Sequence, residues 1–160
     1  MLKLELKIPP PIIMLLSGLM AFLISGRDLN FLLHQANASD NIIETLIWPL
    51  VLLFAGIAIA VSGVLEFKRH QTTISPLNPH RSSRIVSNGI FGFSRNPMYL
   101  GMLLVLLGWA DFLDNFIAFA GALFFILYIT KFQIQAEERI LLENFKGEYQ
   151  EYMDRVRRWL

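Results

Sequence analysis

The chain has 160 residues, of which 54% are hydrophobic, and its mean hydropathy is positive. This much apolar surface exceeds what a small soluble core buries, so the composition indicates lipid as the solvent for much of the chain. The formal net charge of +1 gives no general reason to expect nucleic acid as a partner. The absence of cysteine excludes disulfides, thiolate metal sites and a cysteine nucleophile.

Two long apolar stretches in the first half of the chain are predicted to cross a membrane. Residues 8–25 and 45–65 correspond to roughly 27 and 31 Å at a helical rise of about 1.5 Å per residue. The prolines at positions 9–11 fit the start of a helix at the membrane interface. No small-residue cleavage pattern follows Ser25, so we interpret the first stretch as a retained span and not as a signal peptide.

A shorter pair of apolar stretches follows at residues 97–110 and 116–130. Each is roughly 21 to 23 Å long as a helix. They are joined by a five-residue turn that contains Asp111 and Asp114. This pattern predicts a tight helical hairpin, whose shortness implies shielding by protein or local thinning of the membrane.

The charges predict how the chain is oriented. Residues 67–96 contain five Lys or Arg and no acidic residue, whereas residues 27–44 contain one Arg against three acids. Basic loops stay on the cytoplasmic side, so the first segment is expected there and the second on the opposite side. Beyond Lys131, charged residues alternate with apolar ones at helical spacing, which predicts an amphipathic tail that Gly147 breaks into two helices.

The expected fold is therefore all-α: a single multi-pass membrane domain with about four transmembrane helices and both termini in the cytoplasm. Residues 8–66 would form the first two spans, 67–96 a cytoplasmic loop, 97–130 the short hairpin and 131–160 the amphipathic cytoplasmic tail.

The most informative stretch for function is residues 95–101, which read Arg-Asn-Pro-Met-Tyr-Leu-Gly where the basic loop enters the third apolar stretch. A proline in the first turn of a helix leaves neighbouring backbone N–H groups free to face an anionic or polar ligand. Taken singly, Arg95 and Tyr99 are typical interfacial anchors. Asn96 gains little from anchoring, and its amide can both donate to and accept from a ligand.

A carboxylate pair, Glu137 and Glu138, returns to the same level after the hairpin. Adjacent residues on a helix point about 100° apart, so only one of the two can face inward. Gln133 and Glu137 share a helix face at i and i+4, which favours Glu137. For Glu138 we expect a solvated charged face, with weak surface pairs that involve Arg139 and Glu143.

The sequence predicts no metal site, because the three histidines, His34, His70 and His80, are dispersed. It also contains no glycine-rich phosphate loop, nucleophile elbow or Walker-type motif.

Several motifs together resemble one family. They are residues 85–91 (Ile-Val-Ser-Asn-Gly-Ile-Phe), residues 95–101, the Glu137-Glu138 pair and residues 145–152 (Phe-Lys-Gly-Glu-Tyr-Gln-Glu-Tyr). Their order and spacing resemble the isoprenylcysteine carboxyl methyltransferase and phospholipid methyltransferase superfamily. Its pattern is Arg-His-Pro-x-Tyr-x-Gly, a short hairpin, a Glu-Glu pair and a Phe-Gly-x-x-Tyr tail. The match covers roughly residues 72 to 158.

The resemblance implies an integral membrane enzyme that uses S-adenosylmethionine and methylates a lipophilic or amphipathic acceptor, such as a lipid amine, thiol or carboxylate. The cofactor would bind at the cytoplasmic side, between the loop, the start of the third span and the helix after the fourth. The implied cofactor contacts are Ser83, Arg84, Ile85, Val86, Phe91, Asn96, Pro97, Met98, Tyr99 and Glu137. The implied substrate contacts are Gln133 and Arg95.

The chain departs from the family pattern at two positions. Asn96 stands where the motif has histidine, which removes a titratable group. Gln133 stands where the prenylcysteine enzymes have an arginine, and a neutral amide cannot grip a carboxylate as arginine does. Prenylcysteine is therefore a weak candidate for the acceptor, unless Lys131 or Arg95 replaces the missing charge.

Two other readings stay open at this point. Membrane sterol reductases look similar in their last spans and bind a nicotinamide cofactor, although they are usually larger. A non-catalytic membrane adaptor would need neither Asn96 nor Glu137.

Overall fold

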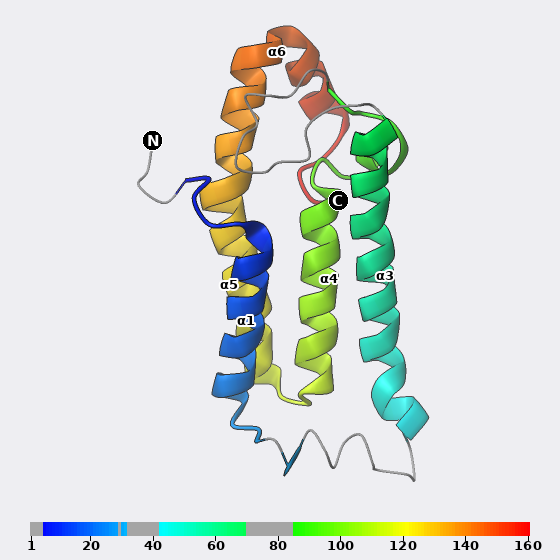
Figure 1. Cartoon of the computed structure of the whole chain (residues 1–160), viewed down its shortest axis with the longest axis vertical. Coiled ribbons are helices and arrows are strands. Elements are labelled where there is room, and N and C mark those ends of the chain that lie inside the picture. Colours follow the sequence, from blue (N-terminus) through cyan, green and yellow to red (C-terminus); the bar gives the residue numbers. More distant parts are fainter. Residues whose placement is uncertain (1–4, 29, 32–41, 70–84) are drawn as a thin grey trace.

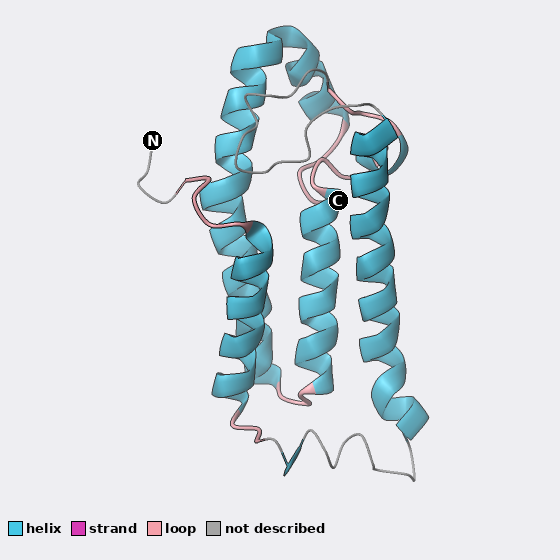
Figure 2. Ribbon diagram, viewed as in Figure 1, coloured by secondary structure: helices cyan, strands magenta, loops and turns pink. Residues whose placement is uncertain are grey.

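The computed structural model describes residues 5–28, 30–31, 42–69 and 85–160, and within these ranges every regular element is a helix (Figure 2). The expected all-α class is therefore confirmed for this part of the chain. Four apolar helices run along the long axis of the molecule (Figure 1). They are α1 (Pro10–Ser25), α3 (Ile42–Arg69), α4 (Pro97–Phe112) and α5 (Phe119–Ile129).

Two helical stretches of the described chain are long and apolar enough to cross a membrane, Thr45–Arg69 and Phe116–Arg155. The helices α1 and α4 are apolar but shorter, with 16 residues each. Large apolar side chains point outward, and Trp48 and Phe54 on α3 are both 65% exposed. Such exposure is costly in water and ordinary in lipid, which supports a membrane location. The count of four spans stays a prediction.

The helix ends follow the local sequence. Pro10 is the first residue of α1, and Gly26 ends this helix in the left-handed conformation with φ of 67°. The second predicted span is longer than expected at both ends, because α3 covers Ile42–Arg69. α4 and α5 are joined by a short turn, but the second arm is longer than the predicted 116–130, because the helical stretch continues to Arg155. The turn is closed by the Asp114 N–H, which donates to the Asp111 carbonyl at 2.9 Å.

Glycines set how closely the helices approach. α4 packs against α3 where Gly101 meets Gly56, and a Cβ on Gly101 would overlap the Gly56 carbonyl oxygen. α5 packs against α1 in the same way, because a Cβ on Gly121 would lie 2.5 Å from the Ser17 carbonyl oxygen. Small residues at such crossings let helix backbones come together in a membrane. One buried cluster joins α1, α4, α5 and the start of the tail: Ile13, Tyr99, Leu106, Ala122, Phe125, Ile129 and Ile134.

The helix α5 continues through a π-helical turn, η4 (Thr130–Ile134), into α6 (Gln135–Arg155). The tail was predicted to break at Gly147, and the break lies one residue earlier, where Lys146 has φ of 43° and ψ of −118°. Beyond this kink the chain turns back, and its last residues reach the start of α4 (Figure 1). The fold therefore brings residues 95–99, Glu137 and the C-terminus to one end of the helices.

Candidate functional site

Three polar side chains meet at the start of α4. The Tyr99 hydroxyl donates to Oε1 of Glu137 at 2.7 Å, and Nε2 of Gln133 donates to the same oxygen at 2.6 Å. Tyr99 and Gln133 are buried, and Glu137 is partly buried. A carboxylate that is removed from water needs such donors, so Tyr99 and Gln133 hold Glu137 in a defined orientation.

The π-helical turn sets the direction of Gln133 and Glu137. It contains one more residue per turn than an α-helix, so it changes which side chains of the following helix face the bundle. The N–H of Leu6 donates to the Phe132 carbonyl in this turn at 3.2 Å. Gln133 lies within the turn and Glu137 lies four residues later, on the same face.

The first turn of α4 contains backbone donors that have no acceptor within the helix. Pro97 occupies the first turn, and the preceding residue, Asn96, makes no side-chain capping bond to the helix. The first backbone bond of the helix runs from the Leu100 N–H to the Asn96 carbonyl at 2.9 Å. The N–H groups of Met98 and Tyr99 precede it, so they have no acceptor within the α-helix. This end of the helix can receive an anionic or polar group.

The prediction for Glu138 was wrong. Its side chain is 8% exposed and pairs with Arg95 at 2.8 Å and with Arg158 at 2.6 Å. Arg139, which was expected to pair with it on the surface, instead pairs with Glu5 at 2.8 Å. The expected divergence of the two glutamates holds, since Glu137 contacts Tyr99 while Glu138 contacts the two arginines. The sequence does not indicate that the chain turns back after Lys146 and covers Glu138.

The predicted site residues Arg95 and Asn96 have partners inside the protein. Nη1 of Arg95 donates to the Met153 carbonyl at 3.0 Å, in addition to its pair with Glu138. Nδ2 of Asn96 donates to the Arg158 carbonyl at 2.9 Å. Arg95 thus forms an ion pair with Glu138 in this structure, and its contact with substrate stays a prediction.

Pro97 and Met98 face a different direction from Tyr99. A Cβ on Gly63 of α3 would lie 3.0 Å from Cγ of Met98 and 3.3 Å from Cγ of Pro97. Their side chains therefore pack on α3.

The predicted residues of the loop lie near the second half of α6. Phe91, in the short helix η2 (Gly89–Gly92), packs edge-on against Phe67 with ring centroids 4.9 Å apart. Its carbonyl accepts from the Tyr152 hydroxyl at 2.8 Å. Ile85 packs on a cluster that includes Tyr152, and Val86 is buried. The remaining two predicted contacts, at positions 83 and 84, lie outside the described residues.

Arg158 is not among the predicted site residues, yet its side chain donates to both oxygens of Glu138. Hydrogen bonding to Glu138 raises the pKa of the Arg158 guanidinium above its ordinary value. The only signal in the sequence is a pair of arginines followed by tryptophan near the C-terminus. In a membrane protein this pattern is equally typical of an interfacial anchor.

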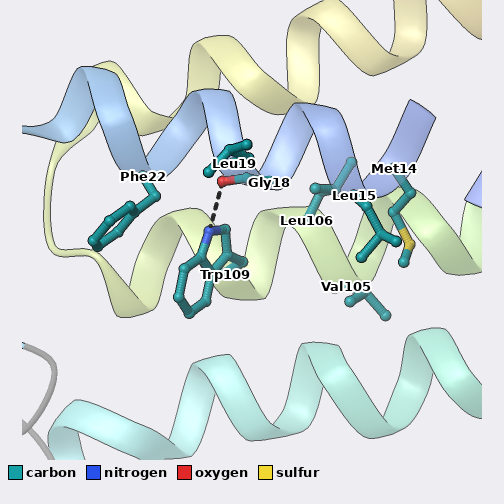
Figure 3. Close-up of a pocket in the computed structure, with 8 residues that line it drawn as sticks. All are labelled: Met14, Leu15, Gly18, Leu19, Phe22, Val105, Leu106 and Trp109. Atoms are coloured by element: carbon teal, nitrogen blue, oxygen red, sulfur yellow. Dashed lines mark hydrogen bonds between the residues drawn. The ribbon is translucent and has the colours of Figure 1, made fainter. Parts of the chain in front are cut away.

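An apolar groove lies between α1 and α4 (Figure 3). Its volume is about 400 Å³. The rim is open to the outside, since Leu15 is 67% and Leu19 is 53% exposed. The hydrogen bond from Nε1 of Trp109 to the Gly18 carbonyl, at 3.0 Å, crosses between the two helices (Figure 3). The lining residues are Met14, Leu15, Gly18, Leu19, Phe22, Val105, Leu106 and Trp109.

The groove and the polar cluster lie on the same side of α4. Leu106, in the groove, follows Tyr99 by seven residues, which is close to two helical turns. Both belong to one buried cluster with Ile13 of α1. The separation along the helix is about 10 Å. Among the described residues, no group of three or more His, Asp or Glu side chains could hold a metal ion.

Comparison with known proteins gives a family match. The family profile described as phospholipid methyltransferase matches residues 45–148. An uncharacterized protein of Haemophilus influenzae is 49% identical over 63 residues, which are 39% of this chain and all of that protein.

Two yeast proteins also match, both named protein-S-isoprenylcysteine O-methyltransferase. The one from Saccharomyces cerevisiae is 32% identical over 72 residues, and the one from Schizosaccharomyces pombe is 33% identical over 75 residues. Each match covers 45% of this chain and 30% of the yeast protein, so the chain spans less than a third of these relatives. No solved structure matches.

Proposed function

Because the chain belongs to the phospholipid methyltransferase family, we propose that it is a membrane methyltransferase that transfers a methyl group from S-adenosylmethionine to a lipophilic or amphipathic acceptor. The observation that carries the proposal is the contact between Tyr99, in the first turn of α4, and Glu137, beyond α5. Thirty-eight residues separate them in sequence. The fold joins two motifs that the family shares.

The chemistry of these groups fits the cofactor. S-adenosylmethionine carries a carboxylate, an ammonium, ribose hydroxyls and a sulfonium. The N–H groups of Met98 and Tyr99 suit the carboxylate. The Glu137 carboxylate can accept from hydroxyl or ammonium donors, and its free lone pairs allow this beside Tyr99 and Gln133. A cation that reached the buried ring of Tyr99 would be attracted to its aromatic face.

When bound, the cofactor would supply an electrophilic methyl group that a nucleophile on the acceptor can attack, with S-adenosylhomocysteine as the leaving group. The work of the chain is then alignment and exclusion of water. Tyr99 and Gln133 hold Glu137 in one orientation before any ligand arrives, so little ordering entropy is lost on binding. Asn96 cannot serve as a titrating base, because its side chain is an amide.

The apolar groove supports a lipophilic acceptor. Hydrocarbon suits a groove that is lined by apolar side chains and open at its rim. We propose that the acceptor's chain lies there, with its reactive head toward Tyr99. The buried site residue at position 133 is glutamine, and a neutral amide favours an acceptor head other than a carboxylate.

The proposed orientation places both termini and the basic loop in the cytoplasm, with four spans. The chain has no cysteine, so single cysteines can be introduced cleanly. Asp154→Cys in the exposed tail and Asp111→Cys in the exposed hairpin turn suit this test. In intact cells an impermeant maleimide should label position 111 and spare position 154. The reverse pattern, or labelling of both, would contradict the orientation.

Calorimetry on detergent-purified protein tests the cofactor. We expect binding of S-adenosylmethionine and no binding of NADPH, and the opposite result would favour a reductase. Tyr99→Ala and Glu137→Ala should each weaken S-adenosylmethionine binding by at least about tenfold, because each removes one partner of the Tyr99–Glu137 hydrogen bond. Glu143→Ala, an exposed glutamate on the same helix, is the matched control. Unchanged affinity in both site variants would remove the site assignment.

Transfer of radiolabel from S-adenosylmethionine in membranes identifies the acceptor class. Label is expected in the lipid fraction. Label confined to small water-soluble thiols or to protein would contradict the proposed lipid acceptor.

A further inference from the structure

Residues 156–160, which we call the C-terminal strap, lie against the start of α4. The backbone N–H of Arg95 donates to the Arg157 carbonyl at 3.0 Å. Nδ2 of Asn96 donates to the Arg158 carbonyl at 2.9 Å. Two consecutive residues before Pro97 thus take partners from two consecutive residues of the strap. Because Asn96 makes no capping bond to its own helix, the strap fixes how the chain enters α4.

An ionic cluster ties the strap to α6. Nη2 and Nε of Arg158 donate to the two oxygens of Glu138, at 2.6 and 3.1 Å. Oε1 of Glu138 also accepts from Nη2 of Arg95 at 2.8 Å. The side chains of Arg95 and Glu138 are each 8% exposed. A two-point grip of arginine on a carboxylate fixes geometry as well as charge, and Arg158 supplies that grip here.

The ionic cluster is connected to both parts of the proposed site, the first turn of α4 and Glu137 on α6. Glu138 is the neighbour of Glu137 on α6, so holding Glu138 fixes the rotation of the helix that aims Glu137 at Tyr99. Arg95 precedes Tyr99 by four residues and leads into the first turn of α4. Trp159 of the strap packs against the buried cluster that contains Tyr99. Arg158 is therefore linked to the first turn of α4 and to the Glu137 carboxylate through one network.

We infer that Arg158 is a positioning residue for methyl transfer, acting through Glu138 and Arg95 to hold Glu137 and the first turn of α4 in the geometry that binds the cofactor. This inference rests on the proposed function. It assigns to the C-terminal strap a role in the site and not only in folding. A purely structural strap would change the amount of folded protein and leave the affinity of the folded fraction unaltered.

The test compares Arg158→Gln with Arg155→Gln. Arg155 is an exposed arginine whose side chain donates, among the described residues, to the Glu151 carbonyl of its own helix at 3.4 Å. Purified folded protein is titrated with S-adenosylmethionine. We expect Arg158→Gln to raise the dissociation constant about tenfold, as for loss of a charge-assisted bond, and Arg155→Gln to leave it unchanged. Arg158→Lys keeps the charge and loses the bidentate contact, so its dissociation constant should lie between those of Arg158→Gln and the unmodified protein.

Hydrogen exchange of the Arg95 amide in the unliganded protein gives a second readout. Arg158→Gln should speed this exchange, because the strap then no longer holds the Arg157 carbonyl in place. If Arg158→Gln fails to fold, Arg158→Lys decides: weaker binding supports the inference, and wild-type binding overturns it. Wild-type affinity in both variants would overturn the inference alone. Failure of the unmodified protein to bind S-adenosylmethionine would overturn the proposed function as well.

Discussion

The two sides of α4 differ in how closely they are packed. Toward α3, glycines on both helices bring the backbones into contact, and a Cβ on Gly108 would lie 2.9 Å from the Pro49 carbonyl oxygen. Toward α1, a groove of about 400 Å³ stays open, and a Cβ on Gly18 would meet its nearest neighbour at 3.6 Å. Figure 1 shows α4 between these two helices.

The side of α4 that faces α3 is therefore closed and structural, whereas the side that faces α1 is accessible to a ligand. Close backbone contact leaves no room for a ligand and makes α3 and α4 one unit. The looser side carries Tyr99 at its polar end and the groove along its length. The following substitutions test that contrast, from the largest expected effect to the smallest.

Gly101→Ala should destabilise the protein by about 1–3 kcal/mol, because the added methyl group overlaps the α3 backbone and the helices must move apart. Thermal unfolding in detergent micelles measures the effect. Gly18→Ala, the same change on the open side, should stay within about 0.5 kcal/mol of the unmodified protein. Equal effects at the two positions would show that the sides are packed alike.

Tyr99→Phe should lower the affinity for S-adenosylmethionine about tenfold, since it deletes the hydroxyl that orients Glu137 and leaves Gln133 as the remaining donor to that oxygen. Calorimetry measures it. Tyr128→Phe is the matched control, because the buried Tyr128 hydroxyl has no hydrogen-bond partner among the described residues. Equal S-adenosylmethionine affinities of Tyr99→Phe and Tyr128→Phe would contradict the proposed role of the Tyr99 hydroxyl.

Trp109→Phe should cost about 1 kcal/mol of stability, the usual contribution of one hydrogen bond, because it removes the bond to the Gly18 carbonyl across the groove. Thermal unfolding again reports the change. Trp48→Phe on the exposed face of α3 should have a smaller effect. A greater loss at Trp48 would contradict the view that Trp109 bridges α1 and α4.

Leu19→Trp should raise the KM for the lipid acceptor roughly threefold by filling part of the groove. Transfer of label into membrane lipid in mixed micelles, at increasing lipid concentration, measures KM. Leu23→Trp, on the same helix and outside the groove, is the control. S-adenosylmethionine affinity should be unchanged in both. An unchanged KM for Leu19→Trp would remove the acceptor from this groove.

The helices of this protein could be predicted because their signals are local. Pro10 and Pro97 mark helix starts, and Asp111 and Asp114 mark the hairpin turn. The break in the tail was predicted within one residue of the observed kink at Lys146. The shared helix face of Gln133 and Glu137 followed from their spacing, and in the structure Gln133 donates to Glu137.

The fate of Glu138 could not be predicted in this way. Its partners, Arg95 and Arg158, lie 43 and 20 residues away in sequence. A glutamate among alternating charges has the same local pattern whether it faces water or a buried arginine. The return of the chain after Lys146 decides between these outcomes. The groove could not be predicted from the sequence either, because apolar residues on α1 and α4 can face lipid or line a cavity.

The sequence by itself determined the apolar helices, their ends and the polar motif at the start of α4, because hydrophobic periodicity, proline and turn chemistry act over a few residues. Only the tertiary structure decided which charges pair, which side of α4 is closed by glycine contacts and how the last residues meet Arg95 and Asn96. Those features depend on groups that are distant in the chain, and they form only when the helices are packed together.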